Sequence, residues 1–276
     1  MIDNKVQKDL RDRFNPEGSS LRQLQLNLLD ILIEFDRICR ANDINYWLDS
    51  GTLLGAARHG GFIPWDDDLD VCILKKDQRK LRKAMKKEVK PPFSFLDTNS
   101  DTAPRRWARL LDNHISVSRI VPKPDSKNET MLNKEHIWLD IFIETNGVPS
   151  TSRFIDKFYS RCFRRRYRLV NDGWIKHFTG VCLFPVAQFT VLTARICGRI
   201  FHPDSLIHDF GTGFYTQRFM HDIFPLGNMS FEGHMFYVPG NCSDYLEHLY
   251  GNWRELPETK ESHNIQGIVD SDNVSN

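Results

Sequence analysis

Residues 46–73 constrain the fold and the chemistry of this chain more than any other stretch. They read as a short strand, a tight turn, a helical stretch and a Gly-Gly loop, and they end in the run DDDLD, which leads into the apolar sequence VCI. Residues two apart in a strand point to the same face, so we expect Asp68 and Asp70 to project together, with Asp66 in line behind them. The pattern predicts a strand that opens with a cluster of carboxylates.

Carboxylates held this close repel one another and raise one another's pKa unless a cation lies between them. A hard divalent ion with oxygen ligands, Mg²⁺ or Mn²⁺, bound also by substrate phosphates, relieves that repulsion. A solvated turn is the alternative for a bare acidic run. Two features favour the metal: Trp65 and VCI place the run at a strand edge, and the turn at Ser50-Gly51-Thr52 opens a helix whose backbone amides can face a phosphate. Together they indicate metal-dependent phosphoryl or nucleotidyl transfer.

The same stretch resembles the signature of the LicD family, which fukutin-like proteins share, G-T/S-x-L-G-x-x-R-x-x-x-x-I-P-W-D-x-D-x-D. The matching residues here are Gly51, Thr52, Leu54, Gly55, Arg58, Ile63, Pro64, Trp65, Asp66, Asp68 and Asp70. Weaker similarity lies in WLDIF at 138–142 and in a C-terminal set that includes FEG at 231–233 and LYGNW at 249–253. Residues from about 150 to 225 are not covered. The resemblance implies an α/β fold, a nucleotidyltransferase-like mixed sheet flanked by helices, with a helical insertion and a C-terminal β/α tail.

The resemblance also implies an activity, the transfer of a phospho-alcohol such as phosphocholine or a polyol phosphate. The donor would be a CDP-linked alcohol, and the acceptor an oligosaccharide or lipid-linked glycan. Asp68, Asp70 and Asp140 would hold the metal ion, and Asp66 or Asp140 would orient or deprotonate the acceptor hydroxyl. The donor phosphates would be held by Ser50, Gly51, Thr52 and Arg58. Two alternatives are a nucleotidyltransferase that acts on a small molecule or sugar, and an inactive glycan- or membrane-binding protein.

Several of these assignments have a structural alternative. Asp140 lies in the apolar run 137–143, where an ionised carboxylate is costly unless it is paired or bound to a metal, and a salt bridge to a nearby arginine would also satisfy it. Arg58 could pair with Asp66 or Asp67 instead of phosphate. Ser50 and Thr52 could cap a helix, and Trp65 could pack in the core. Arg109 and Asp112 are weaker candidates for substrate contacts, and Glu144 is expected at a solvated strand end.

Composition limits the class of protein. The 276 residues include 37 Lys and Arg against 36 Asp and Glu, so no overall positive field indicates nucleic acid. The six cysteines are far apart, without a C-x-x-C pair, and most lie in apolar stretches, which favours free thiols in a reducing cytoplasm. The first residues are polar and charged, without the apolar region of a signal peptide. We expect a cytoplasmic protein, with a peripheral position on the inner face of the plasma membrane as a further option.

The middle of the chain carries a separate signal. A basic run at 161–168 is followed by an uncharged stretch at 178–194. A spanning helix needs about 20 apolar residues, and this stretch is shorter and contains Gln188, Pro185 and three threonines, so we do not expect it to cross a membrane. The two remaining interpretations are a buried helical hairpin and a surface patch that contacts an anionic membrane.

The chain divides into five segments by pattern. We expect a loose arm at 1–18, a catalytic core at 19–149, a helical insertion at 150–225, the C-terminal part of the catalytic domain at 226–260 and a flexible tail at 261–276. Helical spacing predicts a helix over 21–38, and further helices are expected at 52–59 and 78–89. Strands are expected at 44–48, 69–74, 93–96, 108–111, 115–121 and 137–143.

Overall fold

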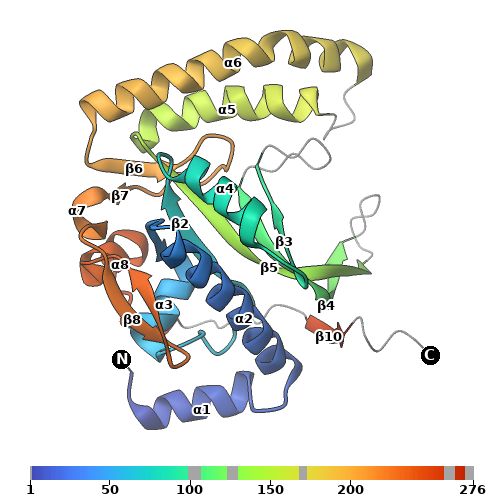
Figure 1. Ribbon diagram of the computed structural model, residues 1–276, viewed down its shortest axis with the longest axis vertical. Coiled ribbons are helices and arrows are strands. Elements are labelled where there is room, and N and C mark those ends of the chain that lie inside the picture. Colours follow the sequence, from blue (N-terminus) through green and yellow to red (C-terminus); the bar gives the residue numbers. More distant parts are fainter. Residues whose placement is uncertain (1, 99–106, 123–129, 168–172, 258–264, 271–276) are drawn as a thin grey trace.

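The computed structural model describes residues 2–98, 107–122, 130–167, 173–257 and 265–270, and within them the chain forms a mixed, curled sheet flanked by helices (Figure 1). The main sheet has eight strands in the order β1-β2-β5-β4-β10, with β3 on β4, and with β6 and then β7 on β5. Its strands are β1 (Tyr46–Leu48), β2 (Asp70–Leu74), β3 (Phe93–Leu96), β4 (Ala108–Pro122), β5 (Thr130–Asn146), β6 (Ser205–His208), β7 (Arg218–Phe219) and β10 (Ile265–Asp270). A separate hairpin is formed by β8 (Gly227–Phe231) and β9 (His234–Val238). The expected fold class is confirmed.

The helices cover the faces and one end of this sheet. They are α1 (Asn4–Phe14), α2 (Ser20–Ala41), α3 (Ser50–His59), α4 (Gln78–Glu88), α5 (Pro149–Arg166), α6 (Gly173–Phe201), α7 (Met220–Ile223) and α8 (Cys242–Tyr250). Ser19 caps α2 by accepting a hydrogen bond from the amide of Arg22, and the predicted apolar spacing buries Leu24, Leu28 and Phe35 in the core. Figure 1 shows α5 and α6 at one end of the molecule and α1 at the other.

Alternation along the strands divides the sheet into an apolar face and a polar face. Val71 and Ile73 of β2 belong to the main hydrophobic core together with the buried residues of α2. Asp70 and Cys72 point to the other face, because neighbouring strand residues face opposite ways. The parallel pairing of β2 with β5 places Asp70 opposite Asp140. The candidate site therefore lies on the polar face, at the start of β2.

The N-terminal segment differs from the expected loose arm. Residues 4–14 form α1, whose first turn is capped by the carboxylate of Asp3. The helix is fastened to the core because Gln7 contacts the His59 ring at 2.7 Å and Asn15 donates to Gln25 at 2.6 Å. These contacts join residues 52 and 10 positions apart in sequence, so local pattern did not reveal them.

Two strands that were expected separately form one. β4 runs without a break through both 108–111 and 115–121, and its register against β5 shifts between Asp112 and Ser116. The shift marks a β-bulge, which interrupts the alternation that a single regular strand would show. The sequence pattern therefore looked like two shorter strands.

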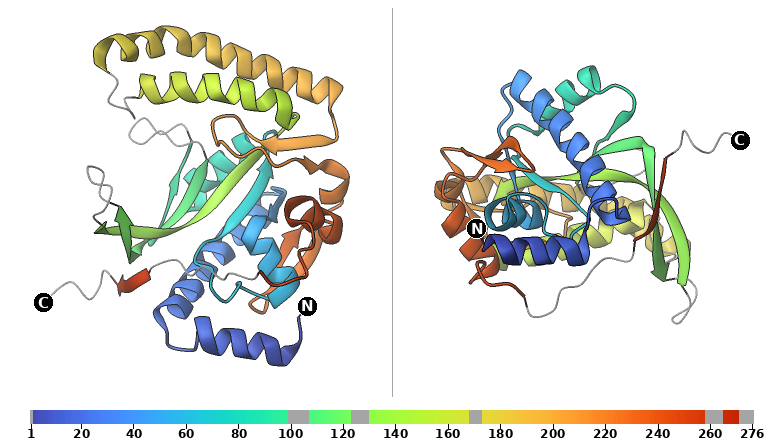
Figure 2. Two further views of the ribbon diagram at one scale, coloured as in Figure 1. Left: turned by 180° about the vertical axis from the view of Figure 1, so that it is seen from behind. Right: turned by 90° about the horizontal axis from the view of Figure 1, so that it is seen from below.

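The helical segment is shorter than the predicted insertion. α5 and α6 pack side by side as an antiparallel hairpin, as the left view of Figure 2 shows, but β6 and β7 join the main sheet through β5. The strands between 205 and 219 therefore belong to the main sheet, and the hairpin ends at Phe201. Gly198 allows α6 to approach the end of β5, since a Cβ there would lie 2.2 Å from the carbonyl oxygen of Asn146.

α6 continues through Pro185 as one helix of 29 residues. By length and composition alone it is sufficient to cross a membrane, with a mean hydropathy of 1.5 in its most apolar stretch, of which 22% is buried. Core helices of soluble proteins meet the same requirement of length and composition. The helix extends beyond the stretch 178–194 at both ends, and whether it crosses a membrane stays a prediction. It forms a hairpin with α5, as one interpretation expected, although its outer side is exposed and not buried.

The C-terminal segment returns to the sheet. After α8 the chain reaches β10, which pairs antiparallel with β4. The expected flexible tail at 261–276 is therefore structured at Ile265–Asp270, whereas 261–264 and 271–276 lie outside the described residues. Arg168 of the basic run lies outside them as well.

Candidate active site

Four carboxylates gather around the start of β2. Asp66, Asp67 and Asp68 lie in the loop before the strand, and Asp70 is its first residue. Removal from water raises the pKa of Asp70 well above its usual range, and the charges of Asp68 and Asp140 raise it further. Asp68 itself is exposed. The structure thus brings together Asp66, Asp68, Asp70 and Asp140, although Asp68 belongs to the loop and not to the strand.

The first turn of α3 lies against Asp66. A Cβ added to Gly51 would stand 2.7 Å from Oδ2 of Asp66, so only glycine leaves the carboxylate in place. Burial raises the pKa of Asp66 well above its usual range, and Asp68 and Asp67 add to the shift. The amides at the start of a helix have no partner within the helix. A positive helix end and a group of repelling carboxylates therefore meet at one point.

The hydroxyls of this turn are already engaged with protein. Thr52 Oγ1 accepts a hydrogen bond from the amide of Asp70 at 2.8 Å, and Ser50 Oγ donates to Asp49 at 3.1 Å. Ser50 has a φ of 48°, in the left-handed region. Thr52 thus fastens α3 to the start of β2, whereas Ser50 contacts only Asp49, the N-cap residue of α3, and neither side chain caps the helix.

Arg58 does not lie with the acidic group. It is buried at the far end of α3, where Nη1 donates to the carbonyl oxygens of Trp253 and Glu255 at 3.1 and 3.0 Å. The Arg58 guanidinium contacts neither the turn at residues 50–52 nor the carboxylates of Asp66 and Asp67. Trp65 is also a core residue, with ring centroids 5.3 Å from Phe14.

Asp140 meets both interpretations that the sequence left open. It lies beside Asp70, and its Oδ1 also accepts from Nε of Arg109 at 2.6 Å and from Nε1 of Trp107 at 2.7 Å. The guanidinium of Arg109 stacks over the Trp138 ring at 4.0 Å. Arg109 is thus the cation of the acidic group, in the place where Arg58 was expected.

Asp49 is a site residue that the sequence analysis missed. It is fully buried, and burial would raise its pKa, but Arg218 at 2.6 Å holds the pKa of Asp49 well below its usual range. The hydroxyl of Tyr245 also donates to it, at 2.5 Å. An aspartate at the end of the apolar run 44–48 was a usable signal, by the argument applied to Asp140. Arg218 and Tyr245 carried no local signal.

A second polar group lies deeper along the same face. Cys72, Glu144 and His208 are buried, and their ligand atoms lie within 4.8 Å of one another, the one such group of three metal-capable side chains in the described part of the chain. His208 Nδ1 lies 2.5 Å and Arg218 Nε 3.8 Å from Oε1 of Glu144. By composition this group could hold a metal ion, but Arg218 already supplies a cation. The expectation that Glu144 is solvated was wrong, because β6 covers it.

Aromatic rings adjoin the acidic group. Trp107 lies 5.3 Å from Phe142 and 6.2 Å from Phe214, centroid to centroid, and Phe214 is half exposed. Tyr250, at the end of α8, has its pKa raised by burial and by the charges of Asp49 and Asp70. The arrangement offers carboxylates, one guanidinium, a helix start and flat apolar rings, a combination that suits a phosphorylated ligand with a planar or cationic group.

The geometry gathers carboxylates, a guanidinium and a helix start at one point of an α/β fold, and the comparisons with known proteins show which family has this fold. The model of the family described as LicD/FKTN/FKRP, nucleotidyltransferase domain, matches residues 43–194, and the chain belongs to this family. The predicted resemblance is confirmed.

Individual relatives share different lengths of the chain. The lipopolysaccharide cholinephosphotransferase LicD of Haemophilus influenzae is 27% identical over 90% of this chain and 97% of its own length. An uncharacterized protein of Rickettsia prowazekii, RP689, is 43% identical over 26% of this chain and 25% of its own. The ribitol 5-phosphate transferase FKRP of Homo sapiens is 52% identical over 14% of this chain and 8% of its own. The family membership makes this protein a relative of transferases that handle phospho-alcohols.

Proposed function

We propose that this protein transfers a phospho-alcohol, such as phosphocholine or a polyol phosphate, from a CDP-linked donor to a hydroxyl of a cell-surface glycan or of its lipid-linked precursor. The observation that carries the proposal is the group of carboxylates around Asp70 at the start of β2, which lies against the first turn of α3. The length of the match to a lipopolysaccharide cholinephosphotransferase supports the class of reaction.

A divalent cation fits this group. The donor set consists of oxygens, which suits Mg²⁺ or Mn²⁺, and the side chains of Asp66 and Asp70 form no ion pair among the described residues. Asp68, Asp70 and Asp140 would hold the ion, although as a set their oxygens do not lie within 4.8 Å of one another in this structure. When bound, the ion would neutralise the donor diphosphate and favour departure of the nucleotide.

The chain's own residues would bind and orient the two substrates. Arg109 is held by Asp140 and Trp138, and its planar guanidinium suits a donor phosphate. The amides at Gly51 and Thr52 would face a second phosphate oxygen. Asp66 would orient the acceptor hydroxyl. Arg58 is left out of the proposal because its donors are used within the protein.

The substrate assay tests the proposal directly. The purified chain would be incubated with CDP-choline, CDP-ribitol, CDP-glycerol and free nucleotides, with Mg²⁺ or with excess chelator. We expect CMP release from one CDP-linked alcohol in the presence of Mg²⁺ only. Turnover of a free nucleoside triphosphate with release of pyrophosphate, and none with the CDP-linked alcohols, would replace this function by nucleotidyl transfer.

Variants test the site. Asp140→Ala should lower turnover by on the order of 10²- to 10⁴-fold, as expected for a group that acts on the reacting atoms, while donor binding stays measurable. Asp12→Asn, an exposed aspartate on α1, is the matched control and should retain full activity. If Asp140→Ala unfolds the protein and the added change Arg109→Leu restores both folding and activity, Asp140 serves only as the partner of Arg109.

A further inference from the structure

The outer face of α6 exposes an uncharged stripe from end to end. Seven exposed residues spaced three or four apart lie on one side of the helix: Phe178, Cys182, Pro185, Phe189, Thr193, Ile196 and Ile200. Phe178 and Phe189 are 62% and 69% exposed. The opposite side, with Gly180, Phe184 and Val191, is buried. A helix of a globular protein normally turns its polar side to water, so the exposed stripe calls for a partner of its own.

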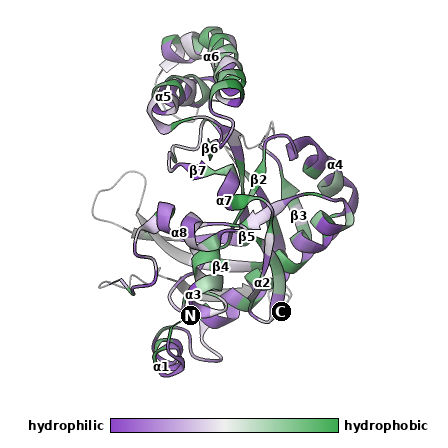
Figure 3. Ribbon diagram, turned by 90° about the vertical axis from the view of Figure 1, so that its left-hand side faces the viewer, coloured by the Kyte–Doolittle hydropathy of each residue, from purple (hydrophilic) through white to green (hydrophobic). Residues whose placement is uncertain are grey.

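The threonines of this region do not make it polar. Thr190 and Thr193 donate their hydroxyls to the carbonyl oxygens of Val186 and Phe189, one turn earlier, at 2.9 and 3.0 Å. Their hydrogen bonds are therefore satisfied inside the helix, and a methyl group remains at the surface. Figure 3 shows α6 as the outermost element at its end of the molecule.

Charge is strongly concentrated on the hairpin. α5 and α6 contain nine Lys and Arg residues and one acidic residue, the buried Asp156, which gives the pair a formal charge of +8. The whole chain has a formal charge of +1, so the rest of the protein is acidic. Arg153, Lys157, Arg161 and Arg164 are exposed and lie along one side of α5. The apolar stripe therefore sits on a strongly basic part of the described chain.

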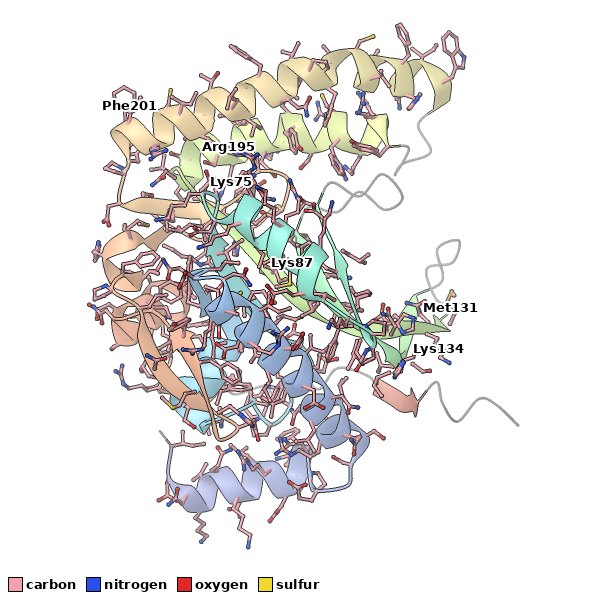
Figure 4. The ribbon with its side chains drawn as sticks, in the orientation of Figure 1. Lys75, Lys87, Met131, Lys134, Arg195 and Phe201 are labelled. Atoms are coloured by element: carbon pink, nitrogen blue, oxygen red, sulfur yellow. The ribbon has the colours of Figure 1, made fainter. Side chains whose placement is uncertain are left out.

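Two depressions flank the C-terminal half of α6. One, of about 480 Å³, is apolar and lined in part by Phe189, Cys197 and Phe201. The other, of about 490 Å³, is lined in part by four basic residues, Lys75, Lys76, Arg195 and Arg199. Figure 4 shows Lys75 and Arg195 close together beneath the helix and Phe201 at its end.

The basic residues of the second depression are only partly neutralised. Lys75 and Arg195 both pair with Asp209, at 2.8 and 2.7 Å. Lys76 and Arg199 are exposed and form no ion pair among the described residues. One side of the helix thus suits hydrocarbon and the other suits a phosphate.

We propose that α6 docks the protein on bilayers that contain anionic phospholipids, with the helix lying in the plane of the membrane. The uncharged stripe enters the boundary between headgroups and hydrocarbon, and the basic residues meet lipid phosphates. The helix lies flat because its inner side is packed on α5 and on the end of β5.

The placement brings the acidic site near the membrane. Leu74, at the end of β2, lines the basic depression, and Asp70 opens the same strand. Four residue steps of a strand span on the order of 13 Å. The acidic group thus lies one strand length from the basic depression. The docking itself does not depend on the proposed reaction.

Vesicle flotation with the full chain tests the docking. We expect binding to phosphatidylcholine vesicles that contain phosphatidylglycerol, and little binding to phosphatidylcholine alone. The combined change Phe178→Ser, Phe189→Ser and Ile196→Ser should lower vesicle affinity at least about 100-fold, because each replaces an apolar group that leaves water on docking. Val6→Ser with Met235→Ser removes exposed apolar groups elsewhere and should have no effect.

Charge variants test whether Lys76 and Arg199 contact lipid phosphates. Lys76→Gln with Arg199→Gln should weaken binding roughly 30-fold, since each basic residue near the surface contributes about 1 kcal/mol. Lys86→Gln with Lys87→Gln removes the same charge from α4 and is the matched control, which should bind as the natural chain does. Equal losses in the two pairs would show attraction by net charge alone and overturn the assignment to this surface.

A label on the stripe separates docking from other contacts. Cys182 is exposed, Cys242 is partly buried, and Cys39, Cys72 and Cys162 are buried. After Cys197→Ser and Cys242→Ser an environment-sensitive dye can therefore report from Cys182. Its emission should shift to the blue on addition of anionic vesicles. An unchanged spectrum, or a dimer in solution that Phe189→Ser dissociates without any vesicle binding, would overturn the proposal. Vesicle binding without turnover of any CDP-linked donor would instead reject only the proposed reaction.

Discussion

Replacing Arg218 with methionine should destabilise the protein far more than removing an exposed arginine with equally good ion-pair geometry. Arg218 is 3% exposed and lies 2.6 Å from Asp49, which is fully buried. Methionine keeps the apolar bulk but leaves Asp49 without its cation. Removing one partner of a buried ion pair costs about 3–5 kcal/mol, and a protein of this size loses about 2–4 °C of Tm per kcal/mol. We expect Tm to fall by roughly 6–20 °C.

The loss of stability in Arg218→Met should depend on pH in a definite direction. In the natural protein Arg218 holds the pKa of Asp49 below its usual range, so the pair contributes stability above the unfolded-state pKa of about 3.9, and this contribution is lost as the pH falls through the folded-state value. In Arg218→Met the main opposing charge is gone, so burial outweighs the remaining effects of His208 and of the Tyr245 hydrogen bond and raises the pKa of Asp49. The deficit should therefore be greatest at pH 7 and should shrink toward pH 4–5, where Asp49 can take up a proton.

Urea unfolding at pH 7 and pH 5, followed by circular dichroism, measures both effects. Arg37→Met is the matched control, because Arg37 pairs with Glu34 at 2.8 Å but is 51% exposed, and such surface pairs contribute at most about 1 kcal/mol. Equal losses in the two variants would refute the reasoning. So would a deficit in Arg218→Met that grows as the pH is lowered.

Three further predictions concern the acidic group and its surroundings. Asp70→Asn should lower metal-dependent turnover by on the order of 10³-fold. It should also raise Tm in chelator at pH 7–8, because the pKa of Asp70 is raised in the folded protein and its ionised form therefore costs stability above the unfolded-state pKa. A lower Tm in chelator would contradict this. Gly51→Ala should displace the Asp66 carboxylate and lower turnover at unchanged secondary structure, as followed by steady-state kinetics and circular dichroism, and normal turnover would show that the contact is not needed. Phe214→Ala should raise KM for the CDP-linked donor roughly fivefold, since stacking on a base contributes about 1 kcal/mol or more, with kcat nearly unchanged; a loss confined to kcat would argue against a binding role.

Much of the site could be predicted because its signals are local. The spacing of Asp66, Asp68 and Asp70 before an apolar run indicated a carboxylate group, and the strand position of Asp140 indicated a buried acid that needs a partner. The parallel register of β2 and β5 brings Asp70 and Asp140 together. What failed was the assignment of Arg58, since its direction depends on where the C-terminal segment packs, and nothing near Arg58 in the sequence reports that.

The sequence by itself determined several elements of the fold, because hydrophobic periodicity and turn residues act over a few positions: the apolar spacing of α2, the acidic opening of β2 and the uncharged stretch of α6 are all legible in the chain. The tertiary structure alone decided which charges are neutralised. Asp49 meets Arg218 and Tyr245 from 169 and 196 residues away, and the tail returns to pair with β4. It also decided that the stretch 178–194, apolar enough for a core, lies with one side in solvent. Burial is a property of packing between distant elements, and the energy of an ion pair or of an apolar surface depends on that burial more than on the residue type.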